Sequence, residues 1–270
     1  MDTRFWGPSG WKLFHLITFD DSNKSSINLA RFLETIPYIL PCKFCRTSLT
    51  DYYRQHPYKV NGKMDPKLDL KKWMYTIHNC VNGKLRKQGL HPQADPTYEQ
   101  VKKYYTEFKK ESWDQQLLNL WDFLFSVAYH HPKESSVGSE PMPECPPDIK
   151  KCRDPQEQNK WNVLPWKKRM YWYQSFWVFL PAVLPKEIRT RWQKLEETNP
   201  PQWDSRRSMM AWLWRMRCGL DENFHDPYTT VCHRIKTYSS DCGKKNGAIT
   251  CRKRSTRHIS SRRKTLRKTK

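Results

Sequence analysis

Apolar side chains recur at helical spacing along most of the chain, and this periodicity limits the possible folds more than any other feature. One such stripe runs through Leu70, Trp73 and Ile77, whose spacing of three and four residues places them on one face of a helix. The alternation of apolar and polar residues that is typical of strands is missing, and no repeat of roughly 20 to 50 residues is visible. We therefore predict an all-α fold.

Capping residues and prolines predict where these helices begin and end. We expect a first helix over residues 9–19, with a proline near its start. Pro37 is expected to interrupt the second helix, because proline removes a backbone hydrogen bond. Asp95 and Pro96 predict the cap and first turn of a fifth helix. A single amphipathic helix is expected over residues 112–130.

The chain has 270 residues, which is long enough for two domains. One segment between the helical stretches is crowded with Ser, Gly and Pro, as linkers often are. We expect a compact helical unit over residues 1–110, a connecting helix of the second domain over 111–131, a Pro-rich linker over 132–160, a Trp-rich helical domain over 161–242, and a basic, disordered tail over 243–270.

The formal net charge is +22, and much of this charge is local. Residues 244–270 contain 12 Lys or Arg and no acidic residue. An excess of positive charge predicts attraction to polyanions but says nothing about the fold. The tail is therefore either a solvated, disordered extension or an arm that binds polyanions non-specifically, with an affinity that falls as salt rises.

Cysteine is frequent in this chain, which has nine of them. We find no signal peptide, no transit peptide, and no run of the roughly 18 apolar residues that a membrane span needs. In a reducing compartment, so many cysteines favour metal binding or thiol chemistry over structural disulfides.

Cys42-Lys43-Phe44-Cys45 places two thiols three positions apart, ahead of residues that can continue as a helix. If a helix starts at the first cysteine, free amide N–H groups and the helix dipole stabilise a thiolate there. The same spacing serves zinc sites, thioredoxin-like folds and chance pairs. Zinc would need two further ligands nearby, and a thioredoxin-like fold would need strands, so we favour a redox pair and predict no metal site.

Three local patterns stand together in the first part of the chain. They are Trp11-Lys12-Leu13-Phe14-His15, Cys42-Lys43-Phe44-Cys45, and His78-Asn79-Cys80-Val81-Asn82-Gly83-Lys84-Leu85-Arg86-Lys87. Jointly they resemble the Erv/ALR family of FAD-linked sulfhydryl oxidases, through its Trp-x-x-x-His helix and its His-Asn-x-Val-Asn-x-x-Leu-x-Lys helix. The resemblance covers roughly residues 5–108.

The resemblance implies a helical bundle that holds FAD, usually as a homodimer, and that oxidises dithiols in protein substrates. The appended helical domain makes the chain similar to versions encoded by large DNA viruses, including mimivirus-like ones. With no targeting segment, this implies a late viral protein in the host cytoplasm, the virion, or both.

By the same resemblance, Cys42 exchanges with incoming dithiols, and Cys45 is the flavin-proximal thiol that attacks the ring. Electrons then pass from the dithiol to the cysteine pair, to FAD, and to O2, giving H2O2. The residues expected to bind the cofactor are Trp6, Gly7, Trp11, His15, Cys45, His78, Asn79, Val81, Asn82, Lys84, Leu85 and Lys87.

The residue types agree with this interpretation, because a flavin needs an aromatic slot, polar groups that orient it, and cations for its pyrophosphate. Trp11 and His15 share a helix face and can pack on the ring, while Lys84 and Lys87 offer positive charge. Taken alone, the first pair would more often be core packing. His78 and its polar neighbours would more often be a hydrogen-bond network within a bundle.

Cys145 and Cys152 form a second close pair in the Pro-rich linker and are candidates for a shuttle that relays electrons from the substrate. A structural bridge or two free thiols are the alternatives. Cys218, Cys232, Cys242 and Cys251 could form two further bridges, although a sequence does not give connectivity. The competing functional hypothesis is a non-catalytic scaffold whose basic second half binds nucleic acid or a virion component.

Overall fold

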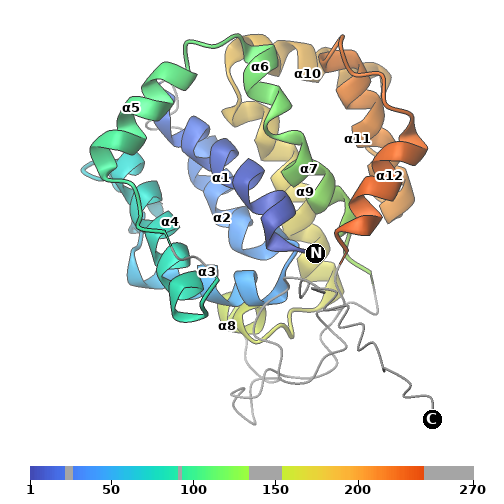
Figure 1. Cartoon of the computed structure of the whole chain (residues 1–270). Coiled ribbons are helices and arrows are strands. Elements are labelled where there is room, and N and C mark those ends of the chain that lie inside the picture. The colour runs from blue at the N-terminus through green and yellow to red at the C-terminus, as the bar shows by residue number, and fades with distance from the viewer. Residues whose placement is uncertain (22–26, 91–92, 134–153, 240–270) are drawn as a thin grey trace, which may run out of the picture.

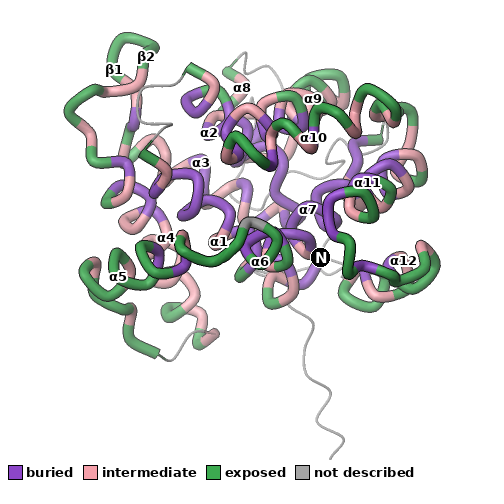
Figure 2. Tube along the Cα trace, turned by 90° about the horizontal axis from the view of Figure 1, so that it is seen from above, coloured by how far each residue is buried: buried purple, intermediate pink, exposed green. Residues whose placement is uncertain are grey.

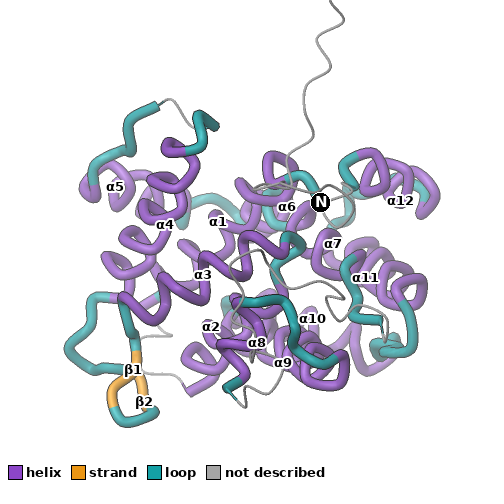
Figure 3. Tube along the Cα trace, turned by 90° about the horizontal axis from the view of Figure 1, so that it is seen from below, coloured by secondary structure: helices purple, strands orange, loops and turns teal. Residues whose placement is uncertain are grey.

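The computed structural model describes residues 1–21, 27–90, 93–133 and 154–239 (Figure 1). These residues form helices and one short antiparallel hairpin, β1 (Lys59–Val60) with β2 (Lys63–Met64), which lies at one edge of the molecule (Figure 3). The hairpin turns at Asn61 and Gly62, which both have positive φ angles, 51° and 77°, as Asn-Gly turns require. The predicted all-α fold is confirmed.

Twelve helices are present in the described part of the chain. In chain order they are α1 (Thr3–Phe19), α2 (Ile27–Ile39), α3 (Lys43–Gln55), α4 (Leu70–Lys87), α5 (Tyr98–Phe108), α6 (Trp113–Leu118), α7 (Trp121–Tyr129), α8 (Pro155–Lys160), α9 (Trp166–Val183), α10 (Lys186–Thr198), α11 (Arg206–Leu220) and α12 (Tyr228–Thr237).

The first two helices extend past the prolines that were expected to limit them. α1 begins at Thr3, because the Asp2 carboxylate caps it by accepting the Arg4 amide N–H at 2.9 Å, and Pro8 lies inside the helix. α2 continues through Pro37 to Ile39. The expected start at residue 9 and the expected interruption at Pro37 are both wrong.

The cap of α5 also differs from the expectation. Thr97 is the N-cap and forms a capping box with Gln100, so the helix starts after Pro96 rather than at it. The Asp95 carboxylate instead accepts a hydrogen bond from the Asn82 amide at 2.8 Å and pairs with Arg86 at 2.6 Å. Asp95 therefore ties the loop to α4.

The helix expected over residues 112–130 is in fact two helices, α6 and α7. Ser9 of α1 stabilises the break between them, because its hydroxyl accepts the Phe123 amide N–H at 2.6 Å and donates to the Leu120 carbonyl at 3.2 Å. The break thus keeps its buried backbone groups paired. A contact from another helix, rather than a local sequence signal, makes this interruption possible.

Helices from both sides of residue 110 share one apolar core (Figure 2). α2 packs along α9, and α1 packs against α4 on one side and α7 on the other. Phe32 of α2 and Phe176 of α9 are fully buried and lie 5.5 Å apart, centre to centre. The division at residue 110 remains a prediction about the sequence, because the two parts are packed together in the structure.

Candidate active site

The cysteine pair lies at the start of α3, as the sequence predicts. Cys42 is the N-cap residue, and its sulfur accepts the Cys45 amide N–H at 3.4 Å. Both cysteines are free thiols in the structure. Cys42 is almost completely buried, with 1% of its surface exposed, so a protein dithiol reaches its sulfur only if surrounding residues move.

The surroundings of the pair favour ionisation of Cys42 over Cys45. Burial alone would raise the pKa of Cys42, but hydrogen bonds from the Cys45 thiol and amide, together with the charges of the Met1 ammonium and Arg46, lower it to about 6. The pKa of Cys45 is raised, because its thiol donates to Cys42 and because it is buried. Cys42 is therefore the first thiol of the pair to ionise as pH rises.

A cavity of about 570 Å³ opens beside Cys42 and Cys45 between α1, α3, α4 and α5. Its walls are largely apolar and aromatic, and three cationic side chains reach it. The lining residues are Thr3, Arg4, Trp6, Gly7, Pro8, Trp11, Lys12, Phe14, Leu40, Cys42, Phe44, Cys45, Ser48, Leu49, His78, Val81, Asn82, Lys84, Leu85, Gln88, Tyr104 and Tyr105.

Most residues expected to bind the cofactor line this cavity, including Trp6, Gly7, Val81 and Leu85. His15, Asn79 and Lys87 do not. Asn79 and His15 line a neighbouring cavity of about 310 Å³ against α5.

His15 lies behind the cavity wall. His15 is 1% exposed, its Nε2 lies 3.1 Å from Nδ1 of His78, and Tyr105 stacks on it at 4.8 Å. Burial, followed by the charge of His78, lowers the pKa of His15 to about 3, so the ring is neutral. His78 in turn stacks on Trp11 at 3.9 Å, which fixes the indole that faces the cavity.

Several lining residues were missed by the sequence analysis. Ser48 lies three positions after Cys45 and so shares its face of α3, a signal that helical spacing could have given. Lys84 donates to the Ser48 hydroxyl at 2.5 Å and to the Phe44 carbonyl at 3.2 Å, which links α4 to the cysteine helix. Arg4 and Tyr104 have no such local signal, because only the packing of α1 and α5 brings them to the cavity.

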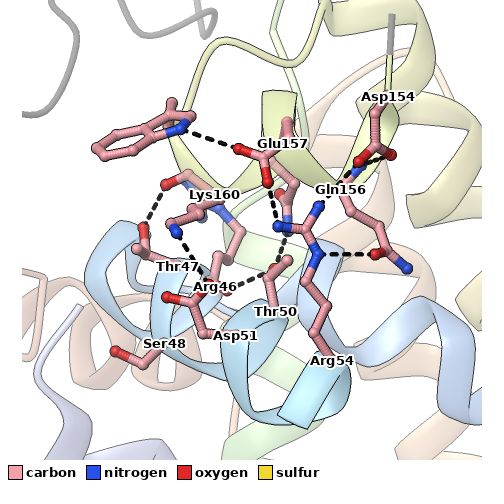
Figure 4. A network of polar contacts seen from close by, with 12 residues as sticks. Arg46, Thr47, Ser48, Thr50, Asp51, Arg54, Asp154, Gln156, Glu157 and Lys160 are labelled. Carbon is pink, nitrogen blue, oxygen red and sulfur yellow. Dashed lines mark hydrogen bonds and ion pairs between the residues drawn. The ribbon is translucent and has the colours of Figure 1, made fainter. Parts of the chain in front are cut away.

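A polar network joins the cysteine helix α3 to α8 (Figure 4). Thr47 donates to the Lys160 carbonyl at 2.6 Å, and Asp51 pairs with the Lys160 ammonium at 3.1 Å. Arg54 makes ion pairs with Asp154, at 2.8 Å, and with Glu157. These contacts hold α8, which lies at the end of the predicted Pro-rich linker, against α3.

Arg46 extends this connection to the cysteine pair itself. Its buried guanidinium donates to the Leu40 carbonyl at 2.8 Å and to the Asn162 side chain at 2.7 Å. A fixed positive charge is therefore held beside Cys42 by residues from two distant parts of the chain.

Other predicted features lie partly or wholly outside the described residues. Cys145, Cys152, Cys242, Cys251 and the basic tail belong to segments that the structure does not describe, while Cys218 and Cys232 are free thiols. Within the described ranges, no three His, Cys, Asp or Glu side chains converge in a way that could hold a metal ion. None of the helices there is long and apolar enough to cross a membrane.

Fold and site together define a helical bundle in which a cysteine pair at a helix N-terminus opens onto an aromatic cavity. The chain belongs to the Erv1/Alr family, whose model matches residues 8–113. The resemblance seen in the sequence is thereby confirmed.

Three viral relatives show the extent of the similarity. A probable FAD-linked sulfhydryl oxidase of Acanthamoeba polyphaga mimivirus is 28% identical over 119 residues, which cover 42% of this chain and 80% of the relative. An FAD-linked sulfhydryl oxidase of African swine fever virus is 30% identical over 87 residues, which cover 31% of this chain and 70% of the relative. A putative FAD-linked sulfhydryl oxidase of Invertebrate iridescent virus 6 is 31% identical over 99 residues, which cover 32% of this chain and 85% of the relative. No solved structure gives a significant match.

Proposed function

We propose that this protein is an FAD-linked thiol oxidase that forms disulfides in protein substrates through Cys42 and Cys45. The observation that carries the proposal is the position of the pair, at the N-terminus of α3 and on the wall of the 570 Å³ cavity. Family membership and the names of the viral relatives support it.

The residues around the cavity fit a flavin dinucleotide. Trp11, stacked on His78, supplies a flat aromatic wall, and a Cβ atom at Gly7 would meet no atom within 4 Å, so the cavity is open there. The Trp6 indole N–H is buried and has no hydrogen-bond partner in the described part of the protein, which leaves a donor for a ligand. Arg4, Lys12 and Lys84 are suited to hold a pyrophosphate.

Bound FAD would take two electrons from the reduced cysteine pair and pass them to O2, giving H2O2. The remaining steps use the protein's own sulfurs. A substrate thiolate attacks Cys42 of the oxidised pair, which forms a mixed disulfide and breaks the Cys42–Cys45 bond. Cys45 leaves as a thiolate and takes up a proton, because its pKa is raised. The second substrate thiolate attacks the substrate sulfur, and Cys42 leaves as a thiolate. The substrate has then lost two electrons and two protons.

The different pKa values of the two thiols suit this sequence. Cys42 leaves readily because its thiolate is stabilised. Cys45 stays protonated, and its S–H donates a hydrogen bond to the Cys42 sulfur. Lys84 faces Cys45 and favours the thiolate that must form there before electrons leave the pair. Cys42 thus exchanges disulfides with the substrate, and Cys45 is the thiol from which electrons pass to the cofactor.

The test is the visible spectrum of the purified protein during addition of a dithiol. We expect a yellow protein whose flavin absorbance bleaches and recovers in air, whereas Cys45→Ser should retain flavin but not bleach. A colourless protein that consumes no oxygen would contradict the proposal and favour the non-catalytic scaffold.

Cys145 and Cys152 are proposed as the substrate-side shuttle. Replacing both by Ser should abolish oxidation of a protein dithiol while activity on a small dithiol stays unchanged. Equal losses on both substrates would exclude the shuttle.

A further inference from the structure

We infer that the chain contains the same five-helix bundle twice, and that the second copy replaces the second subunit of a dimer. The first copy is α1–α5, and the second is α7 with α9–α12 (Figure 1). The main helix–helix contacts inside the first copy have counterparts in the second, whereas the β1–β2 hairpin has none. The pairs α1·α4, α2·α3, α3·α4, α1·α5 and α4·α5 correspond to α7·α11, α9·α10, α10·α11, α7·α12 and α11·α12.

The corner before the cysteine helix is repeated in sequence and in hydrogen bonding. Leu40-Pro41 precedes α3, and Leu184-Pro185 precedes α10. Arg46 donates to the Leu40 carbonyl at 2.8 Å, and Arg189 donates to the Leu184 carbonyl at 2.9 Å.

A threonine after each corner and a proline before it repeat as well. Thr47 and Thr190, which follow these arginines, each bond to a carbonyl four residues earlier, at 3.1 and 2.9 Å. α2 and α9 each contain a proline two residues before their last residue, Pro37 and Pro181.

The next helix fixes a second point of correspondence. In α4, the Trp73 indole donates to the carbonyl of His56, the C-cap of α3, at 2.8 Å. In α11, the Trp212 indole donates to the carbonyl of Asn199, the C-cap of α10, at 2.9 Å. The same side chain therefore makes the same bond to the same place in each copy.

The last helix of each copy agrees with this register. Tyr98 of α5 packs on Tyr75, and Tyr228 of α12 packs on Trp214, with ring centres 5.5 and 6.1 Å apart. Tyr75 and Trp214 each stand two residues after the tryptophans just described. The Tyr98 hydroxyl reaches the N-cap of α4, and the Tyr228 hydroxyl reaches the first turn of α11.

The first helices correspond through their aromatic pairs. Trp11 and His15 of α1 lie 6.2 Å apart at 43°, and Trp121 and Phe125 of α7 lie 6.1 Å apart at 41°. Both pairs have the same spacing of four residues along the chain.

The two copies meet as the halves of a two-fold symmetric dimer do. In such a dimer each surface element contacts its own counterpart. Here α1 packs on α7 and α2 packs on α9. Phe32 and Phe176, each five residues before the equivalent prolines, face each other across the contact with ring centres 5.5 Å apart. The face that α1 and α2 could offer to another chain is thus already covered.

The second copy has lost the reactive residues of the first. The corner of the second copy is one residue shorter, so Pro185, the counterpart of Pro41, is itself the N-cap of α10 and no residue corresponds to Cys42. Ile188, 1% exposed, stands where the first copy has Cys45. Arg217 takes the place of His78, and its guanidinium lies 5.4 Å from the Trp121 ring and 3.7 Å from that of Phe224.

Packing also fills the place of the cofactor cavity in the second copy. Trp121 is 1% exposed and Phe125 is fully buried, whereas Trp11 faces a cavity. The second copy therefore serves to bury the face of the first, and the chain is a monomer with one flavin site. The prediction of one flavin per chain rests on the proposed function. The predictions that the bundle is repeated and that the chain is a monomer do not.

Sedimentation of the full chain tests the monomer directly. We expect a single species of 32.6 kDa whose mass does not change with concentration, with or without bound flavin. A dimer that forms as concentration rises would overturn the inference. A colourless monomer would contradict the proposed function and leave the repeat intact.

A matched pair of substitutions tests the single flavin site. His78→Ala should lower the flavin bound per chain from one to nearly none, whereas Arg217→Ala, at the equivalent position, should leave it at one. Thermal unfolding of both variants shows whether the fold is retained, and the wild-type flavin count applies even if one variant does not fold. Two flavins per wild-type chain, or loss of flavin from a folded Arg217→Ala variant, would overturn the inference.

Discussion

At the scale of single residues, the pKa of Cys42 depends in part on the positive charge of Arg46, a role that the sequence pattern did not predict. Arg46 follows Cys45 directly, but its role comes from the carbonyl of Leu40 and the side chain of Asn162, which hold the guanidinium in the interior. The other groups that act on Cys42 are the Cys45 thiol and amide and the Met1 ammonium. Removing one positive charge from this set destabilises the thiolate.

Arg46→Gln should raise the pKa of Cys42 above its value of about 6. In wild type the thiolate forms as pH rises through about 6, so in the variant the transition moves to higher pH. Below the pKa, each unit of increase lowers the thiolate fraction about tenfold. The thiolate ultraviolet absorbance of each protein, minus that of its Cys42→Ser counterpart, measures this transition.

Arg46→Lys serves as the control, since it keeps the charge while losing the planar guanidinium. Its transition should stay near that of wild type. If Gln and Lys shift the transition equally, hydrogen bonding rather than charge sets the pKa of Cys42.

At the scale of elements, local signals predicted that helices exist better than where they end. The apolar stripe from Leu70 to Ile77 predicted α4, because its residues are buried on one face. Asp95 was misassigned as a cap because its partners, Asn82 and Arg86, lie on a different helix. The break between α6 and α7 was missed because Ser9 of α1 makes it possible.

Ser9→Ala should destabilise the protein by about 1–3 kcal/mol, because it leaves the buried Phe123 N–H without its partner, although the Leu120 carbonyl still accepts the Leu124 N–H. Chemical denaturation measures the change in the free energy of unfolding. Thr190→Ala is a suitable control, since its hydroxyl bonds to its own helix at an exposed position and should change stability by less than about 0.5 kcal/mol. Equal effects of the two substitutions would show that Ser9 does not stabilise the break.

At the scale of the whole molecule, a cavity of about 570 Å³ inside a helical bundle is a cost that a ligand offsets. FAD should therefore raise the melting temperature, in line with a stabilisation of about 4 kcal/mol when its concentration is 1,000 times the dissociation constant. Thermal unfolding of the flavin-free protein with and without added FAD measures this. Riboflavin, which lacks the pyrophosphate that Arg4, Lys12 and Lys84 would hold, should stabilise less; equal stabilisation by both would exclude a pyrophosphate contact.

The internal repeat escaped the sequence analysis because it has no fixed period. Trp11 and Trp121 are 110 residues apart, whereas Arg46 and Arg189 are 143 apart. The second copy also lost the cysteines and the histidine that made the first recognisable. Hydrogen bonds such as those of the two arginines persist, because they stabilise the same corner whether or not a site is present.

The sequence by itself determined the helical class, the family, and the cysteine pair at a helix start, since each rests on residues close together in the chain. Tertiary structure decided that His15 lies behind the cavity wall, where Tyr105 stacks on it, and that Arg46 sets the charge beside Cys42. It also decided that the second half covers α1 and α2. These outcomes depend on contacts between distant segments, and a sequence pattern does not carry such contacts. The position of the cysteine pair at the start of α3 thus follows from neighbouring residues, but its reactivity depends on the packing of the whole chain.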